Sequence, residues 1–190
     1  MLLRIACFFS FLIPLQSLAQ EKVEREYRVK AREVPAEARD WLDDSFEGRK
    51  KVKWFMEETS GKESYEAKFS WKKEAYSVEF DLSGKIEDIE IQKDWEDLEE
   101  EVRINLGSYF DGKYNKWRIE KIQLQYTGDP DDLEDLMDEE EQEYIQLRYE
   151  IEYYAEGEEG KNLWEGLFDD KGKLIGRREI IIPPADNLFF

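Results

Sequence analysis

A seven-residue pattern that occurs twice, 88 positions apart, constrains the fold of this chain more than any other feature. Residues 80–86 read FDLSGKI and residues 168–174 read FDDKGKL, so both copies carry an aromatic residue, Asp, two spacers, Gly, Lys and a branched aliphatic residue. The glycine suits the tight loop of a β-hairpin, where a residue often adopts a positive φ angle. The repetition predicts two copies of one sheet-building unit.

The segments around these hairpins follow the same order in each half, namely one helix and then four strands. The first helix opens at Val34-Pro35, where proline suits a first turn, and its apolar residues recur at three- and four-residue spacing. Segments in which apolar and charged residues alternate follow it, as in strands with one buried face. The predicted helices cover 34–46 and 95–110, and the predicted strands cover 52–56, 65–71, 76–82, 86–91, 117–126, 144–154, a segment ending at 168, and 174–182.

We therefore expect an α+β fold built from two tandem helix-plus-four-strand repeats, at 20–92 and 93–185. A short strand near 27–32 precedes the first helix, and an apolar tail, 186–190, follows the second repeat. The second repeat also carries an acidic insertion at roughly 128–143. The strand at 117–126 changes phase between Ile119 and Ile122, which predicts a β-bulge.

Residues 1–19 have the pattern of a secretory signal peptide. Arg4 gives a short positive region, residues 5–15 are apolar, and Ser17-Leu18-Ala19 is a small-x-small cleavage site. The apolar run is shorter than the roughly 20 residues that span a bilayer. We therefore expect a periplasmic or secreted protein, cleaved near Ala19, that does not insert into a membrane afterwards.

The chain contains no histidine, and its one cysteine, Cys7, lies in the predicted signal peptide. This composition excludes thiol nucleophiles, histidine general bases and the usual zinc ligands from the mature protein. We expect no cofactor and no enzymatic activity. A hydrolase that uses paired carboxylates stays as a less favoured alternative.

The mature chain is strongly acidic. Removal of Arg4 leaves 27 Lys and Arg residues against 47 Asp and Glu residues, a net charge of −20. Such a surface repels phosphate backbones and anionic lipids, so we expect no nucleic-acid binding. The charge either favours a basic partner or serves only solubility.

The alternation assigns aromatic residues to the face that the helices cover, as the core, and other residues to the opposite, open face. The predicted core aromatics are Trp54, Phe69, Trp71, Tyr76, Trp117, Tyr126, Tyr149, Tyr153 and Trp164. The open face would carry Glu66, Ser70, Ser77, Glu79, Glu150 and Glu152 around four candidate binding residues, Phe55, Lys68, Arg148 and Tyr154. Exposed aromatic residues beside an arginine suit a protein interface, although isolated surface aromatics are also ordinary.

The acidic insertion is a possible calcium site, with Asp129, Asp131 and Asp132 as the candidate ligands. The spacing of an EF-hand fails, however, because Leu133 occupies a ligand position and the required glycine is missing. One alternative is a solvated run of charge. Another is a short amphipathic helix or an adhesive apolar loop, because Leu133, Leu136 and Met137 recur at three- and four-residue spacing. We therefore predict no metal ligands.

The sequence resembles the PepSY-like, beta-lactamase-inhibitor-like family of exported bacterial proteins. The resemblance rests on Val34-Pro35, on Phe46 at the end of the helix, on 52–54 (VKW) and on 76–86, with weaker echoes at 168–173. It implies tandem α-β4 units that form one curved antiparallel sheet with helices packed on one face, and a non-enzymatic periplasmic role. The chain lacks the cysteines of the inhibitory protein of that architecture, and the resemblance transfers no functional residues.

The resulting hypothesis is a non-catalytic exported module that binds a protein or peptide through the open sheet face, as an inhibitor or regulator. The alternatives are a divalent-cation-responsive protein that acts through the insertion, and the carboxylate-based hydrolase. The sequence leaves the oligomeric state open.

Overall fold

The computed structural model describes residues 20–22, 24–59, 61–138 and 144–181. The predicted signal peptide and the tail at 186–190 lie outside these residues. Within the described ranges, none of the helices combines the length and apolar character that crossing a bilayer requires.

In the described part of the chain, the strands form one ten-stranded sheet in the order β1-β10-β9-β8-β7-β6-β5-β4-β3-β2. All neighbouring pairs are antiparallel except β1 with β10, which are parallel. The strands are β1 (Gln20–Lys22), β2 (Glu24–Val29), β3 (Lys53–Thr59), β4 (Lys62–Trp71), β5 (Glu74–Phe80), β6 (Ile86–Gln92), β7 (Lys116–Thr127), β8 (Gln146–Gly157), β9 (Gly160–Phe168) and β10 (Leu174–Ile180).

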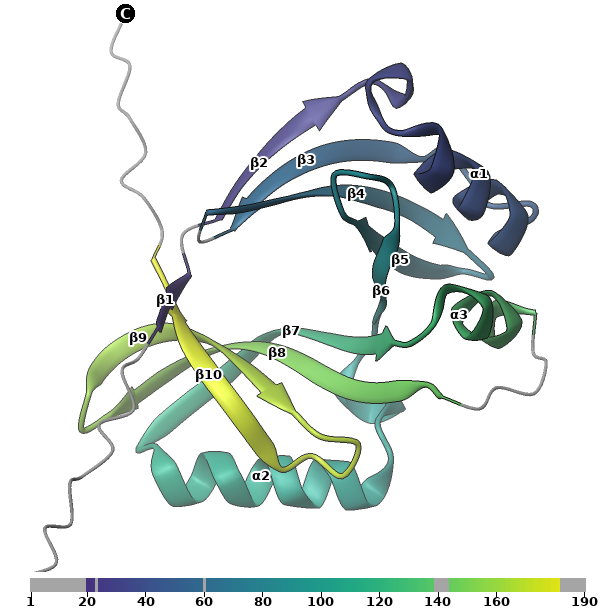
Figure 1. Cartoon of the computed structure of the whole chain (residues 1–190). Coiled ribbons are helices and arrows are strands. Elements are labelled where there is room, and N and C mark those ends of the chain that lie inside the picture. The colour runs from purple at the N-terminus through teal and green to yellow at the C-terminus, as the bar shows by residue number, and fades with distance from the viewer. Residues whose placement is uncertain (1–19, 23, 60, 139–143, 182–190) are drawn as a thin grey trace, which may run out of the picture.

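The helices α1 (Ala36–Ser45), α2 (Glu100–Lys113) and α3 (Pro130–Met137) cover the outer, convex side of the sheet (Figure 1). Beneath α1 and α3 lies one apolar cluster, to which β3 to β6 contribute. Beneath α2 lies a second cluster, to which β7, β8 and β9 contribute. The nine aromatic residues predicted as core belong to these clusters or pack against them, so that prediction is confirmed.

The sheet curls until its two edges meet. Strand β1 pairs with β10 at one edge and β2 pairs with β3 at the other, yet a single residue separates Lys22 from Glu24. Because consecutive Cα atoms are 3.8 Å apart, the two edges approach within about 7.6 Å at this point. Figure 1 shows the sheet curling around its helix-free face. This face therefore lines a cavity rather than forming the open surface that the sequence suggested.

The two hairpin tips have the same hydrogen bonds. Asp81 Oδ1 accepts hydrogen bonds from the backbone N–H groups of Ser83 and Lys85, at 2.8 and 3.0 Å. Asp169 Oδ1 does the same for the residues two and four positions later, at 3.0 and 2.8 Å. Gly84 and Gly172 have φ angles of 98° and 75°.

Each tip also packs tightly on a helix. A Cβ atom on Gly84 would lie 2.8 Å from the Pro35 Cβ, and one on Gly172 would lie 2.9 Å from the Val102 carbonyl oxygen. Glycine is therefore required at both positions for two reasons: the turn needs a positive φ angle, and the contact with α1 or α2 leaves no room for a Cβ atom.

Several predicted boundaries were wrong. The helix predicted at 95–110 is a 3₁₀ turn (Trp95–Asp97) followed by α2, because Leu98 is extended and Glu99 caps α2. The strand near 27–32 ends at Val29, since a 3₁₀ turn (Ala31–Glu33) follows. Strand β8 begins at Gln146, two residues after the predicted start, and β10 ends at Ile180.

Candidate functional site: an acidic cavity inside the curled sheet

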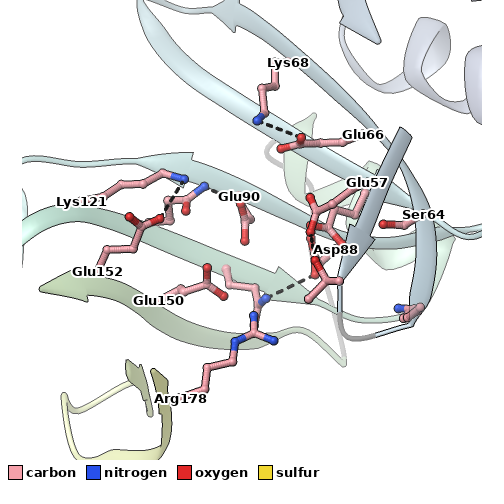
Figure 2. Close-up of a pocket in the computed structure, with 15 residues that line it drawn as sticks. Glu57, Ser64, Glu66, Lys68, Asp88, Glu90, Lys121, Glu150, Glu152 and Arg178 are labelled. Carbon is pink, nitrogen blue, oxygen red and sulfur yellow. Dashed lines mark hydrogen bonds and ion pairs between the residues drawn. The ribbon is translucent and has the colours of Figure 1, made fainter. Parts of the chain in front are cut away.

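A cavity of about 260 Å³ occupies the hollow, and polar side chains line it (Figure 2). They come from β3, β4, β5, β6, β7, β8 and β10, so the cavity spans most of the sheet. Its lining residues are Glu57, Thr59, Lys62, Ser64, Glu66, Lys68, Glu79, Asp88, Glu90, Lys121, Gln123, Gln125, Glu150, Glu152 and Arg178. Seven of these carry carboxyl groups and four are cations, which leaves an excess of three carboxyls (7 − 4).

Strand register brings three carboxyl groups into one row across β4, β5 and β6. Glu66 lies opposite Glu79, and Glu79 lies opposite Asp88. Like charges directly opposite one another on neighbouring strands are destabilising. Ionisation of these three carboxyl groups therefore destabilises the folded state.

A β-bulge places Asp88 in this row. Phe80 pairs with Ile86 and Glu79 pairs with Asp88, so Glu87 is an extra residue in β6. Without it, Asp88 would share the inward phase of Ile86 and point towards α1. A second bulge, between Ile119 and Lys121, similarly turns Lys121, Gln123 and Gln125 towards the cavity, and it confirms the bulge predicted in β7.

The cations of the cavity are engaged by particular carboxylates. Lys68 Nζ lies 2.9 Å from Glu66 Oε2 and 3.1 Å from Glu26 Oε2. Lys121 lies 3.8 Å from Glu152, and Arg178 forms an ion pair with Glu165. Lys62 pairs with Glu87 at 2.6 Å. None of these five ion pairs involves Glu79, Asp88 or Glu90.

Burial and mutual repulsion raise the pKa values of the three remaining carboxyls. Burial, followed by the charge of Asp88, raises the pKa of Glu79 to about 9. Burial, followed by the charge of Glu87, raises the pKa of Asp88 to about 7. Burial, followed by the charge of Glu150, also raises the pKa of Glu90. These groups therefore bind protons more readily than ordinary carboxylates do.

Two amide side chains partly satisfy the cluster. Gln123 donates to Glu90, and Gln125 donates to Asp88 Oδ2 at 3.3 Å. The other oxygen, Asp88 Oδ1, is buried and accepts no hydrogen bond from the described part of the chain.

The structure places all four candidate binding residues on the concave face but does not gather them into one site. Lys68 lines the cavity, and its Nζ lies 5.2 Å from the centre of the Phe55 ring. Arg148 lies opposite Gln125, in a neighbouring hollow with Glu165 and Arg178. Tyr154 is 41% exposed near the end of β8, beside Arg118.

The acidic insertion folds as the amphipathic helix α3, so a purely solvated run of charge was the wrong alternative for 130–137. Leu133 and Met137 are buried against the first apolar cluster, and Trp41 Nε1 donates to the Pro130 carbonyl at 3.3 Å. Asp129 caps the helix, accepting from the backbone N–H of Asp131 at 3.2 Å. Residues 139–143 of the insertion lie outside the described residues.

Sequence reasoning placed Glu66, Glu79, Glu150 and Glu152 on the correct face but missed Glu57, Asp88, Glu90 and the glutamines. The signal for Asp88 is the three-residue spacing between Ile86 and Ile89, which differs from the two-residue spacing elsewhere in the strands. That spacing indicates a bulge and reverses the faces of the residues after it.

Comparison with known proteins identifies the fold. Neither protein-family profiles nor curated proteins give a match to this chain. Among solved structures, a DUF2874 family protein from Bacteroides ovatus is 14% identical, with a TM-score of 0.52, over 77% of this chain and 87% of that one. A BLIP-like protein from Bacteroides fragilis is 14% identical, with a TM-score of 0.50, over 83% of this chain and 92% of that one.

A further similar structure, from Bacteroides eggerthii, is provisionally described as periplasmic; it is 10% identical, with a TM-score of 0.50, over 77% of this chain and 88% of that one. At these identities the similarity concerns the fold, and the chain shares the curved, mostly antiparallel α+β architecture of the DUF2874 and BLIP-like proteins.

Proposed function

We propose that this protein is an exported, non-catalytic binding module that accepts a positively charged side chain of a protein or peptide partner in the acidic cavity. The observation that carries the proposal is the excess of acidic groups in the cavity, in which seven carboxyl groups face four cations. The raised pKa values of Glu79, Asp88 and Glu90 mean that a bound cation would favour the ionised form of these groups. Holding like charges together costs stability, and a bound cationic group would relieve that cost.

The size of the cavity favours a side chain over a larger ligand. Small-molecule sites usually measure about 300–1,000 Å³, and this cavity measures about 260 Å³. A lysine or arginine side chain suits such a space, because carboxylates accept strong charge-assisted hydrogen bonds from ammonium and guanidinium groups. The net charge of the chain would also attract a basic partner over longer distances.

The carboxylate-based hydrolase has less support. A glycosidase needs two carboxyl groups placed on either side of a bound sugar, whereas Glu79, Asp88 and Glu90 converge on one another. The described residues that line the cavity also include no aromatic side chain on which a sugar ring could stack.

The periplasmic location and the inhibitory or regulatory role remain parts of this proposal. The signal-like residues 1–19 support export, as do structural neighbours described as BLIP-like or provisionally as periplasmic. We also infer that the two halves are tandem repeats, at 20–92 and 93–185. The inference rests on the recurring order of one helix and four strands, and on the matching hydrogen bonds at Asp81 and Asp169.

The test is a binding titration of the folded protein with a lysine- and arginine-rich decapeptide, compared with a glutamate-rich decapeptide of equal length. We expect saturable binding of the basic peptide alone, weakening as salt rises from 50 to 500 mM because ions screen the charges. The double variant Glu150→Gln/Glu152→Gln removes two cavity carboxyls and should weaken binding. Equal affinity for both peptides would refute the proposal.

Glu156→Gln is the matched control. Glu156 lies on the same strand as Glu150 and Glu152 but does not line the cavity. Its substitution should leave the affinity for the basic peptide unchanged. An equal loss in this variant would mean that the peptide binds the acidic surface in general.

A further inference from the structure

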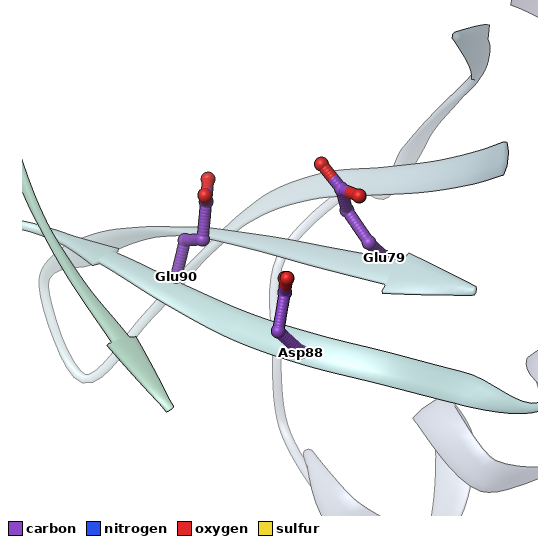
Figure 3. A group of neighbouring side chains, drawn as sticks. All are labelled: Glu79, Asp88 and Glu90. Carbon is purple, nitrogen blue, oxygen red and sulfur yellow. The ribbon is translucent and has the colours of Figure 1, made fainter. Parts of the chain in front are cut away.

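The carboxyl groups of Glu79, Asp88 and Glu90 converge at one point of the cavity wall. Each offers an oxygen atom, and these oxygens all lie within 4.8 Å of one another. The three side chains rise from the neighbouring strands β5 and β6 on the same side of the sheet (Figure 3). The register that pairs Glu79 with Asp88 fixes this arrangement in the backbone.

Unsatisfied oxygen atoms set this cluster apart from an ordinary acidic surface. Asp88 Oδ1 is buried and has no hydrogen-bond partner among the described residues. Such an atom commonly marks the place of a water molecule or an ion. Glu90, which is only 6% exposed, points to the same place and accepts a hydrogen bond from the neutral amide of Gln123.

The lysines of the cavity form ion pairs with carboxylates outside the cluster. Lys62 pairs with Glu87, Lys68 with Glu66 and Lys121 with Glu152. A cation bound at the cluster would therefore not have to displace one of these ion pairs.

The number and type of the ligands favour calcium over magnesium. Calcium takes six to eight oxygen ligands at 2.3–2.6 Å, so ligands on opposite sides of the ion lie about 4.6–5.2 Å apart. The corresponding separation around magnesium, with bonds of 2.0–2.1 Å, is about 4.0–4.2 Å. Three oxygens that lie within 4.8 Å of one another are close enough to share one ion of either kind. Three carboxylates favour calcium, because magnesium keeps several waters and is usually bound through only one or two carboxylates.

We propose that Glu79, Asp88 and Glu90 form a binding site for a calcium ion, with water completing its coordination. This site can be tested separately from the proposed function. Its three carboxyl groups lie on β5 and β6, whereas the variants of the peptide-binding test substitute Glu150 and Glu152 on β8. A bound Ca²⁺ ion would favour the ionised form of the three carboxyls, whose pKa values are raised in its absence.

The helix α3 is the competing location, because the sequence offered Asp129, Asp131 and Asp132 as ligands. In the structure these residues lie at the start of a helix, where acidic side chains stabilise the helix dipole. One carboxylate oxygen of Asp129 also accepts the hydrogen bond that caps the helix. The site on the sheet and the site on the helix predict different mutational results.

The experiment is a calorimetric titration of chelator-treated protein with CaCl₂ at pH 8, to about 5 mM, which covers the ~10⁻⁴–10⁻³ M affinities of extracellular modules. We expect saturable binding of one ion, a higher melting temperature and weaker binding of Mg²⁺. Asp88→Asn and Glu79→Gln should each weaken Ca²⁺ binding by roughly tenfold or more while the protein stays folded, as circular dichroism would report.

Asp131→Asn/Asp132→Asn is the matched control and should keep the affinity of the unaltered protein for Ca²⁺. Glu150→Gln/Glu152→Gln should weaken Ca²⁺ binding less than Asp88→Asn does, which separates this site from the peptide site. Absence of both heat and a melting shift would overturn the proposal. A loss of binding in the α3 variant, with Asp88→Asn unaffected, would overturn it as well.

Discussion

Replacing Asp88 with asparagine should make the calcium-free protein more stable at alkaline pH. Asparagine has nearly the same shape and can still accept the hydrogen bond from Gln125, but it cannot ionise. In the native protein, burial and the surrounding charges raise the pKa of Asp88 from 3.8 to about 7. The carboxyl is thus easier to protonate in the folded chain than in the unfolded chain.

The sign of the effect follows from this difference. When the pKa of a group is higher in the folded than in the unfolded protein, protonation of the group stabilises the folded state. This stabilisation is complete at pH values below the unfolded-state pKa and is lost as the pH rises to the folded-state pKa. For Asp88 the loss extends from about pH 4 to about pH 7. The difference of about three pH units, at about 1.4 kcal/mol each, corresponds to about 4 kcal/mol.

The groups that face Asp88 act in the same direction, with one exception. Glu57 on β3, Glu66 on β4 and Glu87 on β6 raise its pKa, whereas Lys62 on β4 lowers it. Asp88 in turn raises the pKa values of its neighbours Glu79 and Glu90. Removing its charge therefore lets those two carboxyls ionise at lower pH as well.

The assay is thermal unfolding of the unaltered protein and of Asp88→Asn between pH 4 and pH 8, with a chelator present. For a domain of 150–250 residues, 1 kcal/mol shifts the melting temperature by roughly 2–4 °C. The two proteins should melt close together at pH 4, and Asp88→Asn should melt about 8–16 °C higher at pH 8. Asp170→Asn, in the exposed β9–β10 turn, should follow the unaltered protein. Parallel pH profiles for Asp88→Asn and the unaltered protein would refute the reasoning.

Three further predictions concern the fold, and each is checked by chemical denaturation. Gly84→Ala and Gly172→Ala should each destabilise the protein by about 2 kcal/mol or more, because the φ angles are positive and a Cβ would meet α1 or α2. An unchanged denaturation midpoint in both variants would contradict the packing of the hairpin tips on the helices. Leu133→Ala should cost about 2–5 kcal/mol, since this side chain of α3 is completely buried; a cost near zero would mean that α3 is not packed on the sheet. Tyr153→Phe should cost about 1–2 kcal/mol, because its buried hydroxyl lies 3.1 Å from the Tyr114 hydroxyl; a neutral result would show that this hydrogen bond adds nothing to stability.

The sequence predicted the core well because burial in a strand leaves a period-2 signal. Trp54, Tyr76 and Trp164 were placed on the helix-covered face by alternation alone, and all three are buried. The hairpin tips were predictable for a related reason, since Gly84 and Gly172 satisfy local backbone demands. Each of these features depends on a few consecutive residues.

The cavity was not predictable in the same way. Alternation assigns Glu66 and Glu79 to the polar face, but it does not say whether that face is open or enclosed. Enclosure depends on the curl of the sheet, which brings together residues far apart in the chain, such as Glu57 and Arg178. The position of Asp88 depends on a one-residue bulge. In the sequence, this bulge appears only as a three-residue instead of a two-residue spacing between the apolar residues Ile86 and Ile89.

The one-residue connection between β1 and β2 holds the two edges of the sheet together. Since one residue joins two strands that belong to opposite edges, the sheet cannot widen unless β1 leaves β10 or β2 leaves β3. The width of the cavity is thus limited by this one-residue link together with the pairing of β1 with β10 and of β2 with β3. If a ligand binds in the cavity as proposed, little ordering of the protein would have to accompany binding.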